Sequence, residues 1–157
     1  MSKRDERSIK ILPRPGEGKR GETGHLGYLL RQAAGGHRNR MDRALAHLNV
    51  TPPQFGVMTM IKAYPELSSA DLARMSLLTP QTVGVIIANL DRAALIARSP
   101  HPVHGRILRI SLTEQGSSLL AECRLQVESL EQELIAGFTE AEETTIRRWL
   151  VSVATGV

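Results

Sequence analysis

One short segment, residues 79–92, constrains the fold of this chain more than any other. Thr79 and Pro80 are typical of a helix start, because a threonine hydroxyl accepts a free backbone N–H and proline suits the first helical position. Apolar residues then recur at steps of three and four, which predicts a buried face made of Val83, Ile86, Ile87 and Leu90. The residues left facing outward are Gln81, Thr82, Val85, Ala88, Asn89 and Arg92. The segment therefore predicts a helix that packs on one side and presents mostly polar groups on the other.

The neighbouring segments place this helix in a larger motif. Upstream, residues 68–75 begin with two candidate capping serines and predict another short helix, joined to the first by a three-residue turn. Two helices connected in this way form a helix-turn-helix. Downstream, residues 95–98 and 106–112 predict two strands, separated by a loop rich in Pro, His and Gly. A hairpin that follows a helix-turn-helix is a wing.

Longer helices are predicted on both sides of this module. Residues 25–48 carry a stripe of apolar side chains that includes His37, and Gly35 and Gly36 interrupt the segment in its middle. Two glycines inside a helix cost about 2 kcal/mol relative to alanine, so we expect them to reflect close helix packing or room for a ligand. His37 is expected to be either a hydrogen-bonded core residue or a ligand anchor.

Three further helices complete the predicted set. Thr51 caps a helix that runs to about Tyr64, because Pro65 cannot continue it. Residues 113–138 form a long amphipathic helix with a coiled-coil-like apolar seam. Thr139, with Glu142 three residues later, is a capping-box signature for a last helix that carries Ile146, Trp149, Leu150 and Val153. The fold class predicted is therefore mainly α with a small β-hairpin wing.

The charge of the chain is distributed unevenly. Of 157 residues, 41% are apolar, which suffices for one ordinary domain. Residues 1–24 carry seven basic and four acidic groups, residues 25–50 four and one, and residues 51–113 six and three, whereas residues 114–157 carry three and eight. A basic front and an acidic back favour binding of a polyanion by the front, although a net charge of +4 also serves solubility alone.

The N-terminal segment and the single cysteine limit other possibilities. Residues 1–24 are rich in charged residues, Gly and Pro, so we expect a mostly disordered basic tail. The sequence contains neither a membrane-spanning apolar run nor the apolar core of a signal peptide, so we expect a soluble, cytoplasmic protein that does not bind membranes. One cysteine excludes an intrachain disulfide, and no nucleophile motif or phosphate-binding glycine loop indicates an enzyme.

Several short motifs of the wing module, in their order and spacing, resemble one known family. They are Leu95-Ile96-x-Arg98, Gly105-Arg106 and Ile110-x-Leu112-Thr113-x-x-Gly116. Together they resemble the winged-helix core of the MarR family of bacterial transcription regulators. The likeness extends over residues 26–153, including a run before the second helix, residues 48–55. The resemblance implies a single MarR-like domain, residues 25–157, whose winged-helix module is residues 51–113 and whose dimerisation helices lie in residues 25–50 and 114–157.

This resemblance implies binding of double-stranded DNA by a homodimer. Paired helices of residues 79–92 would enter successive major grooves of a pseudo-palindromic operator. Gln or Asn pairs with adenine, and hydroxyl groups contact bases or phosphates, so the expected contacts on this helix are Thr79, Gln81, Thr82, Val85, Asn89 and Arg92. The chain departs from the family pattern at Gly84 and Val85, where a hydroxyl residue and an arginine are common. We expect thinner direct readout there, or contact of Val85 with a thymine methyl.

The wing is expected to add contacts to the DNA backbone and minor groove. Arg106 would enter a narrow minor groove, with Arg98 and Arg109 as contacts to phosphates. The family usually places Asp two residues before this arginine as a brace, whereas this chain has His104. The brace is therefore replaced by a group that adds positive charge when protonated.

The resemblance also implies control by a small aromatic or anionic effector bound between the dimer helices and the winged module. Candidates for lining that site, all on the first two predicted helices, are Tyr28, Arg31, His37 and Met58. Such a ligand would favour a spacing of the two reading helices that no longer matches half-sites about 34 Å apart.

Two alternatives from other classes remain open at this point. The module could instead be a winged helix that docks a protein, or the regulator could respond to a metal or to oxidation. A metal site at His101 and His104 lacks a third ligand nearby in sequence, and we expect no cofactor. Cys123 lies on the apolar seam, which predicts a buried, inert thiol.

Overall fold

Side-chain caps fix where most of the helices begin. The computed structural model describes residues 12–65, 67–100, 103, 105 and 108–156. Five helices start after a Ser or Thr whose hydroxyl accepts the backbone N–H three residues further on: Thr51, Ser68, Thr79, Thr113 and Thr139. Each hydroxyl satisfies one of the N–H groups that a helix start leaves without a partner. The predicted caps Thr51, Ser68, Thr79 and Thr139 are thus confirmed, whereas Ser69, the other candidate for α3, is its first helical residue.

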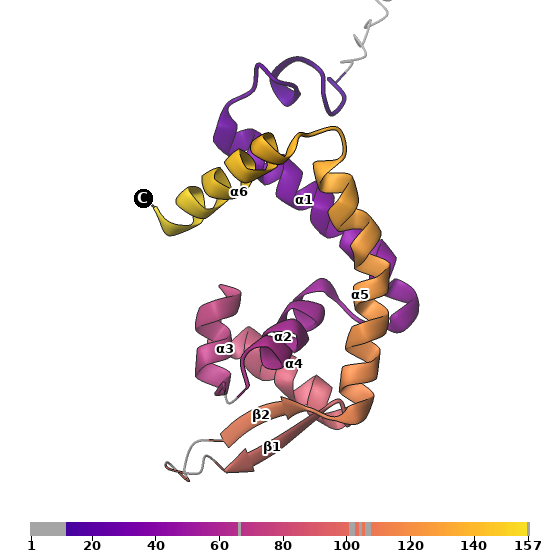
Figure 1. Cartoon of the computed structure of the whole chain (residues 1–157), viewed down its shortest axis with the longest axis vertical. Coiled ribbons are helices and arrows are strands. Elements are labelled where there is room, and N and C mark those ends of the chain that lie inside the picture. Colours follow the sequence, from indigo (N-terminus) through magenta and orange to yellow (C-terminus); the bar gives the residue numbers. More distant parts are fainter. Residues whose placement is uncertain (1–11, 66, 101–102, 104, 106–107, 157) are drawn as a thin grey trace, which may run out of the picture. The chain divides into compact units, whose positions relative to one another are not determined.

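The helices and strands follow the predicted order (Figure 1). The chain forms η1 (Gly18–Arg20), α1 (Leu26–Leu45), η2 (Ala46–Leu48), α2 (Pro52–Ala63), α3 (Ser69–Ser76), α4 (Pro80–Arg92), β1 (Ile96–Pro100), β2 (Leu108–Leu112), α5 (Glu114–Ile135) and α6 (Glu140–Thr155). The chain divides into two compact parts, Met1–Asn39 and Arg40–Val157. No helix in the described ranges is long and apolar enough to cross a membrane.

The first part contains a short folded segment before α1. Its turns are held by polar contacts: an Arg20 guanidinium N–H donates to the Pro13 carbonyl at 2.8 Å, and the Thr23 hydroxyl donates to the Gly18 carbonyl at 3.0 Å. The sequence predicts a mostly disordered tail up to Gly24; residues 12–24 form these turns here, and disorder of the tail in solution stays a prediction. Contacts between a side chain and a backbone group seven residues away leave no periodic pattern, so composition alone did not indicate them.

The larger part is built around a winged-helix core. Its apolar residues come from α2, α3, α4, the hairpin and the start of α5, and those that are almost fully buried include Val57, Met58, Leu72, Val83 and Leu120. In Figure 1, α2, α3 and α4 stand beside the hairpin, from which α5 leads away. A second cluster joins Met41, Leu45 and Val50 to Cys123 and Val127 of α5. These two cores fix α4 and the hairpin on one rigid support.

The hairpin and α5 are joined by a close backbone contact. β1 and β2 are antiparallel, with Ile96 opposite Leu112 and Pro100 opposite Leu108. The Thr113 backbone N–H donates to the Leu95 carbonyl at 3.1 Å, and a side chain on Gly116 would overlap that carbonyl oxygen. Only glycine therefore fits at this position of the first turn of α5.

Candidate nucleic-acid interface

The N-terminus of α4 is preorganised by its cap. Thr79 has extended backbone angles, its hydroxyl accepts the Thr82 N–H at 3.1 Å, and Pro80 occupies the first helical turn. The two threonine hydroxyls also share a hydrogen bond of 2.8 Å. Both side chains are exposed. The first turn therefore presents a fixed pair of hydroxyl groups to whatever contacts this end of the helix.

The two faces of α4 separate as the sequence predicts. Val83, Ile86, Ile87 and Leu90 are buried in the winged-helix core. On the opposite side Gln81, Val85, Ala88 and Arg92 are exposed, as is Asn89 beside them, and Val85 exposes 58% of its surface. Residues four positions apart lie one above the other on a helix, so Gln81, Val85 and Asn89 are close to one line, with Val85 in the middle.

The C-terminal end of α4 has one side-chain hydrogen bond within the helix and one ion pair with the wing. An Arg92 guanidinium N–H donates to the Asn89 side-chain oxygen at 2.9 Å. Arg98 of β1 forms an ion pair of 2.9 Å with Asp91. Both members of this pair are partly exposed, so it contributes little to stability, but it brings a basic group of the wing to the end of the helix.

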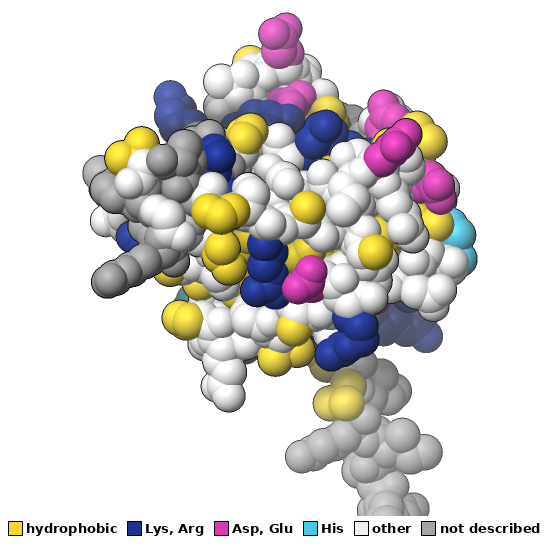
Figure 2. Space-filling model, turned by 90° about the horizontal axis from the view of Figure 1, so that it is seen from below, with side chains coloured by type: hydrophobic (Ala, Val, Ile, Leu, Met, Phe, Trp, Pro, Cys, Tyr) yellow, Lys and Arg dark blue, Asp and Glu magenta, His cyan; other side chains and the backbone are white. Residues whose placement is uncertain are grey.

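The remaining wing residues are only partly placed. Arg109 lies in β2 opposite Ser99 and is half-buried. Arg106, His101 and His104 lie outside the described residues, so the predicted minor-groove contact and the replaced brace stay predictions. Viewed from below, the molecule shows basic and hydrophobic side chains among other side chains and backbone, with most visible acidic groups toward the rim (Figure 2).

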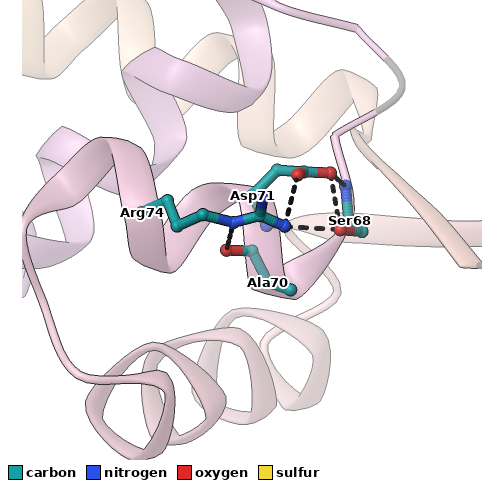
Figure 3. A network of polar contacts seen from close by, with 4 residues as sticks. All are labelled: Ser68, Ala70, Asp71 and Arg74. Atoms are coloured by element: carbon teal, nitrogen blue, oxygen red, sulfur yellow. Dashed lines mark hydrogen bonds and ion pairs between the residues drawn. The ribbon is translucent and has the colours of Figure 1, made fainter.

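α3 carries a polar network that the sequence predicted only as a helix cap. The Ser68 hydroxyl donates to a carboxylate oxygen of Asp71 at 2.6 Å, and the Ser68 backbone N–H donates to the same oxygen at 3.1 Å. These two hydrogen bonds, the side-chain one first, lower the pKa of Asp71, and Arg74 adds an ion pair of 3.1 Å. Figure 3 shows Arg74 lying across the helix toward this carboxylate. Arg74 is an exposed basic group of the module that the sequence analysis did not single out, although an acid and a base three residues apart are a helical pair.

The candidate effector residues fall in both parts of the chain. In Met1–Asn39, the Arg31 guanidinium lies 5.8 Å from the centre of the Tyr28 ring, a cation–π arrangement, and Tyr28 also lines a pocket of about 300 Å³ with Lys19 and His25. His37 is half-buried, and its Nδ1 has no hydrogen-bond partner among the described residues. Met58 belongs to the other part, where it is fully buried in the winged-helix core.

The glycine pair of α1 has no packing explanation within the described residues. An added side-chain carbon at Gly35 or Gly36 would meet no atom within 4 Å. The contacts of the described residues therefore do not explain the two glycines. That they reflect close helix packing or room for a ligand stays a prediction.

The structure also bears on the redox and metal alternatives. Cys123 is fully buried in the second cluster, as predicted, and desolvation, followed by the nearby Glu122 charge, raises the pKa of its thiol. A raised pKa keeps the thiol protonated and slow to oxidise. The described ranges contain no group of three or more His, Cys, Asp or Glu side chains that could hold a metal ion.

A helix-turn-helix whose second helix buries one face and exposes the other, followed by a hairpin, defines a winged helix-turn-helix regulator of transcription. Comparison with known proteins agrees. Residues 48–107 match a model of the MarR family. The chain is 32% identical over 125 residues to the HTH-type transcriptional repressor Rv2887 of Mycobacterium tuberculosis, covering 80% of this chain and 90% of that protein. The chain belongs to the MarR family.

Solved structures of this class resemble the chain over most of its length. A crystal structure of Rv2887 in complex with salicylic acid has 30% sequence identity and a TM-score of 0.66, covering 84% of this chain and 98% of that one. The repressor CouR, bound to a 23-mer DNA duplex, superimposes with a TM-score of 0.75 at 22% identity, covering 83% and 92%. BpsR of Bordetella bronchiseptica, whose DNA binding is regulated by 6-hydroxynicotinic acid, has a TM-score of 0.75 at 25% identity, covering 83% and 93%.

Proposed function

We propose that this protein is a homodimeric, ligand-responsive transcriptional repressor in the cytoplasm, which binds a pseudo-palindromic operator. The observation that carries the proposal is α4: its inner face is locked in the core, and its outer face offers hydroxyl, amide and methyl groups. Such a helix suits the major groove, where bases present hydrogen-bonding edges and thymine methyls.

Within this proposal, the contacts divide between α4 and the wing. Thr79, Gln81, Thr82, Val85, Asn89 and Arg92 are the candidates in the major groove. Arg98, Arg106 and Arg109 are the candidates on the wing, with Arg106 at the minor groove. Arg74 joins them as a candidate phosphate contact, because it is exposed on the helix that precedes the turn.

Dimerisation is proposed through the terminal helices. The exposed apolar residues of α6 include Trp149, Leu150 and Val153, and no residue of α6 is buried within its own chain. An amphipathic helix without an intrachain partner is stabilised when a second copy covers it.

A small aromatic acid is the proposed effector. Arg31 offers a cation for a carboxylate, Tyr28 beside it offers a ring, and His37 has a buried ring nitrogen free to accept or donate a hydrogen bond. Rv2887 has been solved in complex with salicylic acid, and the DNA binding of BpsR is regulated by 6-hydroxynicotinic acid. Met58 is fully buried in the winged-helix core of the other part, so we do not count it among the residues that would contact the effector.

The test is DNA binding by the purified full chain. A duplex selected from a randomised pool should bind in preference to a scrambled duplex, and affinity should fall about a thousandfold from 50 to 200 mM salt if six phosphates are neutralised. Salicylate should release the duplex. The absence of salt-dependent, sequence-selective binding to duplex DNA would instead support the protein-docking alternative.

A further inference from the structure

Gly84 has no role in the chain's own packing. It lies in the middle of α4, where glycine is less favourable than alanine, and a side-chain carbon added there would meet no described atom within 4 Å. Gly116 is the opposite case, because there the Leu95 carbonyl leaves no room for a side chain. The contacts of the described residues therefore account for Gly116 but not for Gly84.

Val85, the next residue, is an exposed apolar group at the centre of the outer face. It leaves 58% of its surface uncovered, between Gln81 one turn earlier and Asn89 one turn later. A branched aliphatic side chain at this point cannot hydrogen-bond to a base or a phosphate. It gains most from contact with another apolar group.

The polar groups around Val85 are partly engaged within the helix. The Thr82 hydroxyl shares a hydrogen bond with Thr79, and the Asn89 side-chain oxygen accepts from Arg92. A bidentate contact from Asn89 to adenine needs that same oxygen as an acceptor. The valine methyl groups, together with the exposed Gln81 amide one turn earlier, are consequently available for contact with a base.

The width of the groove explains why glycine and valine stand together. A helix with its side chains is about 10–12 Å across, and the major groove is about 12 Å wide, so the fit is close. Removing a side chain beside Val85 lets the backbone move toward the base edges. Among the groups that bases present in this groove, only the thymine C5-methyl is apolar.

We propose that Gly84 and Val85 together form a contact specific for thymine: Gly84 allows close approach of α4, and Val85 packs on the C5-methyl of one thymine in each half-site. This inference rests on the proposed function, because it requires α4 to lie in the major groove. It deepens that function by naming the base feature that is recognised and the residues that recognise it.

The first test removes single methyl groups from the DNA. In the best duplex selected by the full chain, each thymine is replaced in turn by deoxyuridine, which lacks only the methyl. One position in each half-site should weaken binding about fourfold, as expected for one methyl contact, and about fifteenfold when both are replaced. The other thymines serve as controls and should change affinity less than twofold.

The second test links that methyl to Val85. With the Val85→Ala protein, the difference between thymine and deoxyuridine at the sensitive position should fall below twofold, since the partner of the methyl is gone. A difference that persists in this variant would overturn the role of Val85.

The third test separates stability from binding at Gly84. Gly84→Ala should raise the melting temperature, because alanine favours the helix, and weaken binding about fivefold or more by crowding a close contact. Gly56→Ala in α2 is the matched control, since a side chain there also meets open space; it should raise the melting temperature without changing DNA affinity.

The outcomes distinguish this inference from the function on which it rests. Sequence-specific binding in which no thymine methyl matters, or a Gly84→Ala variant that binds as tightly as the original, would overturn the thymine contact and leave the repressor intact. Loss of all sequence preference would overturn both.

Discussion

α4 and α6 begin in the same way and end in opposite situations. Each starts after a threonine whose hydroxyl accepts a backbone N–H, and each carries apolar residues at helical spacing. Yet α4 buries four residues against its own chain, whereas α6, which is longer, buries none. Local signals are therefore sufficient to specify a helix but not its partner: α4 completes its packing within one chain, whereas α6 leaves its apolar residues exposed, and we propose that a second copy covers them.

The contrast between α4 and α6 requires that the winged module is stabilised by packing within its own chain. Gly116→Ala places a side-chain carbon on the Leu95 carbonyl, so we expect unfolding in urea to show a loss of about 3 kcal/mol. The same substitution at Gly56 should not destabilise the protein, since space is open there. Equal stability of the two variants would contradict the tight junction between the hairpin and α5.

The comparison is sharpened by removing the largest apolar group of α6. Trp149→Ala should weaken the dimer by about 2 kcal/mol, a thirtyfold rise in its dissociation constant, because aromatic residues dominate such interfaces. Sedimentation equilibrium measures the change. Circular dichroism should meanwhile show an intact winged module.

Arg148→Ala, at the exposed neighbouring position, is the control and should leave the dissociation constant unchanged. A Trp149→Ala protein that associates as tightly as the original would mean that α6 finds its partner elsewhere.

A third substitution separates DNA binding from both cores. Arg106→Ala should reduce operator affinity about tenfold and make it less dependent on salt, because one cation is removed from the minor groove. Fluorescence anisotropy at several salt concentrations measures both effects. Arg124→Ala, an exposed position on α5, should change neither; an unchanged affinity in the Arg106 variant would remove the wing from the proposed interface.

Two of the three capping boxes in the described residues, those of α3 and α6, allow a matched test of these helices. Ser68→Ala should lower the free energy of unfolding by about 1 kcal/mol, because α3 is packed in the module. The depressed pKa of Asp71 means that the carboxylate stabilises the fold above the ordinary aspartate pKa of about 3.9 and that this contribution is lost as pH falls through the lower, folded-state value.

In Ser68→Ala that loss on acidification should shrink, which urea unfolding between pH 2 and 7 would measure. Thr139→Ala removes the equivalent cap of α6 and should weaken dimerisation more than the winged module. If both substitutions lowered the free energy of unfolding of the winged module equally, the proposed difference between α3 and α6 would be contradicted.

The smallest effect concerns the turn that ends α4. Ala94 has a left-handed backbone, with φ of 56°, which alanine adopts at a cost. Ala94→Gly should therefore stabilise the protein by about 0.5 kcal/mol in thermal unfolding, after allowing for the greater freedom of glycine in the unfolded chain. Ala93→Gly, at an ordinary φ of −82°, should destabilise it slightly. A loss of stability in both variants would contradict the strain at Ala94.

Most of the fold could be predicted because its signals are local. Caps, prolines and apolar spacing lie within a few residues of one another, and they place α2, α3 and α4 within a residue or two of their observed bounds. β1 is shifted by one residue at its start and extends to Pro100, because pairing with β2, and not propensity, sets its length.

The interface was less predictable, since it depends on contacts between elements. Nothing in the sequence pairs Asp91 with Arg98, or uses the Asn89 oxygen for Arg92, because both require the side-chain positions of the folded chain. Gly84 is a related case. The sequence shows a glycine at an unusual place in a helix, but only the structure shows that no described atom lies close enough to exclude a side chain there.

The ion pair between Asp91 and Arg98 has a mechanical consequence. It joins the end of α4 to the first strand of the hairpin, and because α4 and the hairpin also share the winged-helix core, a tilt of the helix carries the hairpin with it. A bound effector that tilted α4 would then move both α4 and the hairpin away from DNA together. The operator would consequently dissociate in a single step, because the hairpin could not stay bound to DNA after the helix had left the groove.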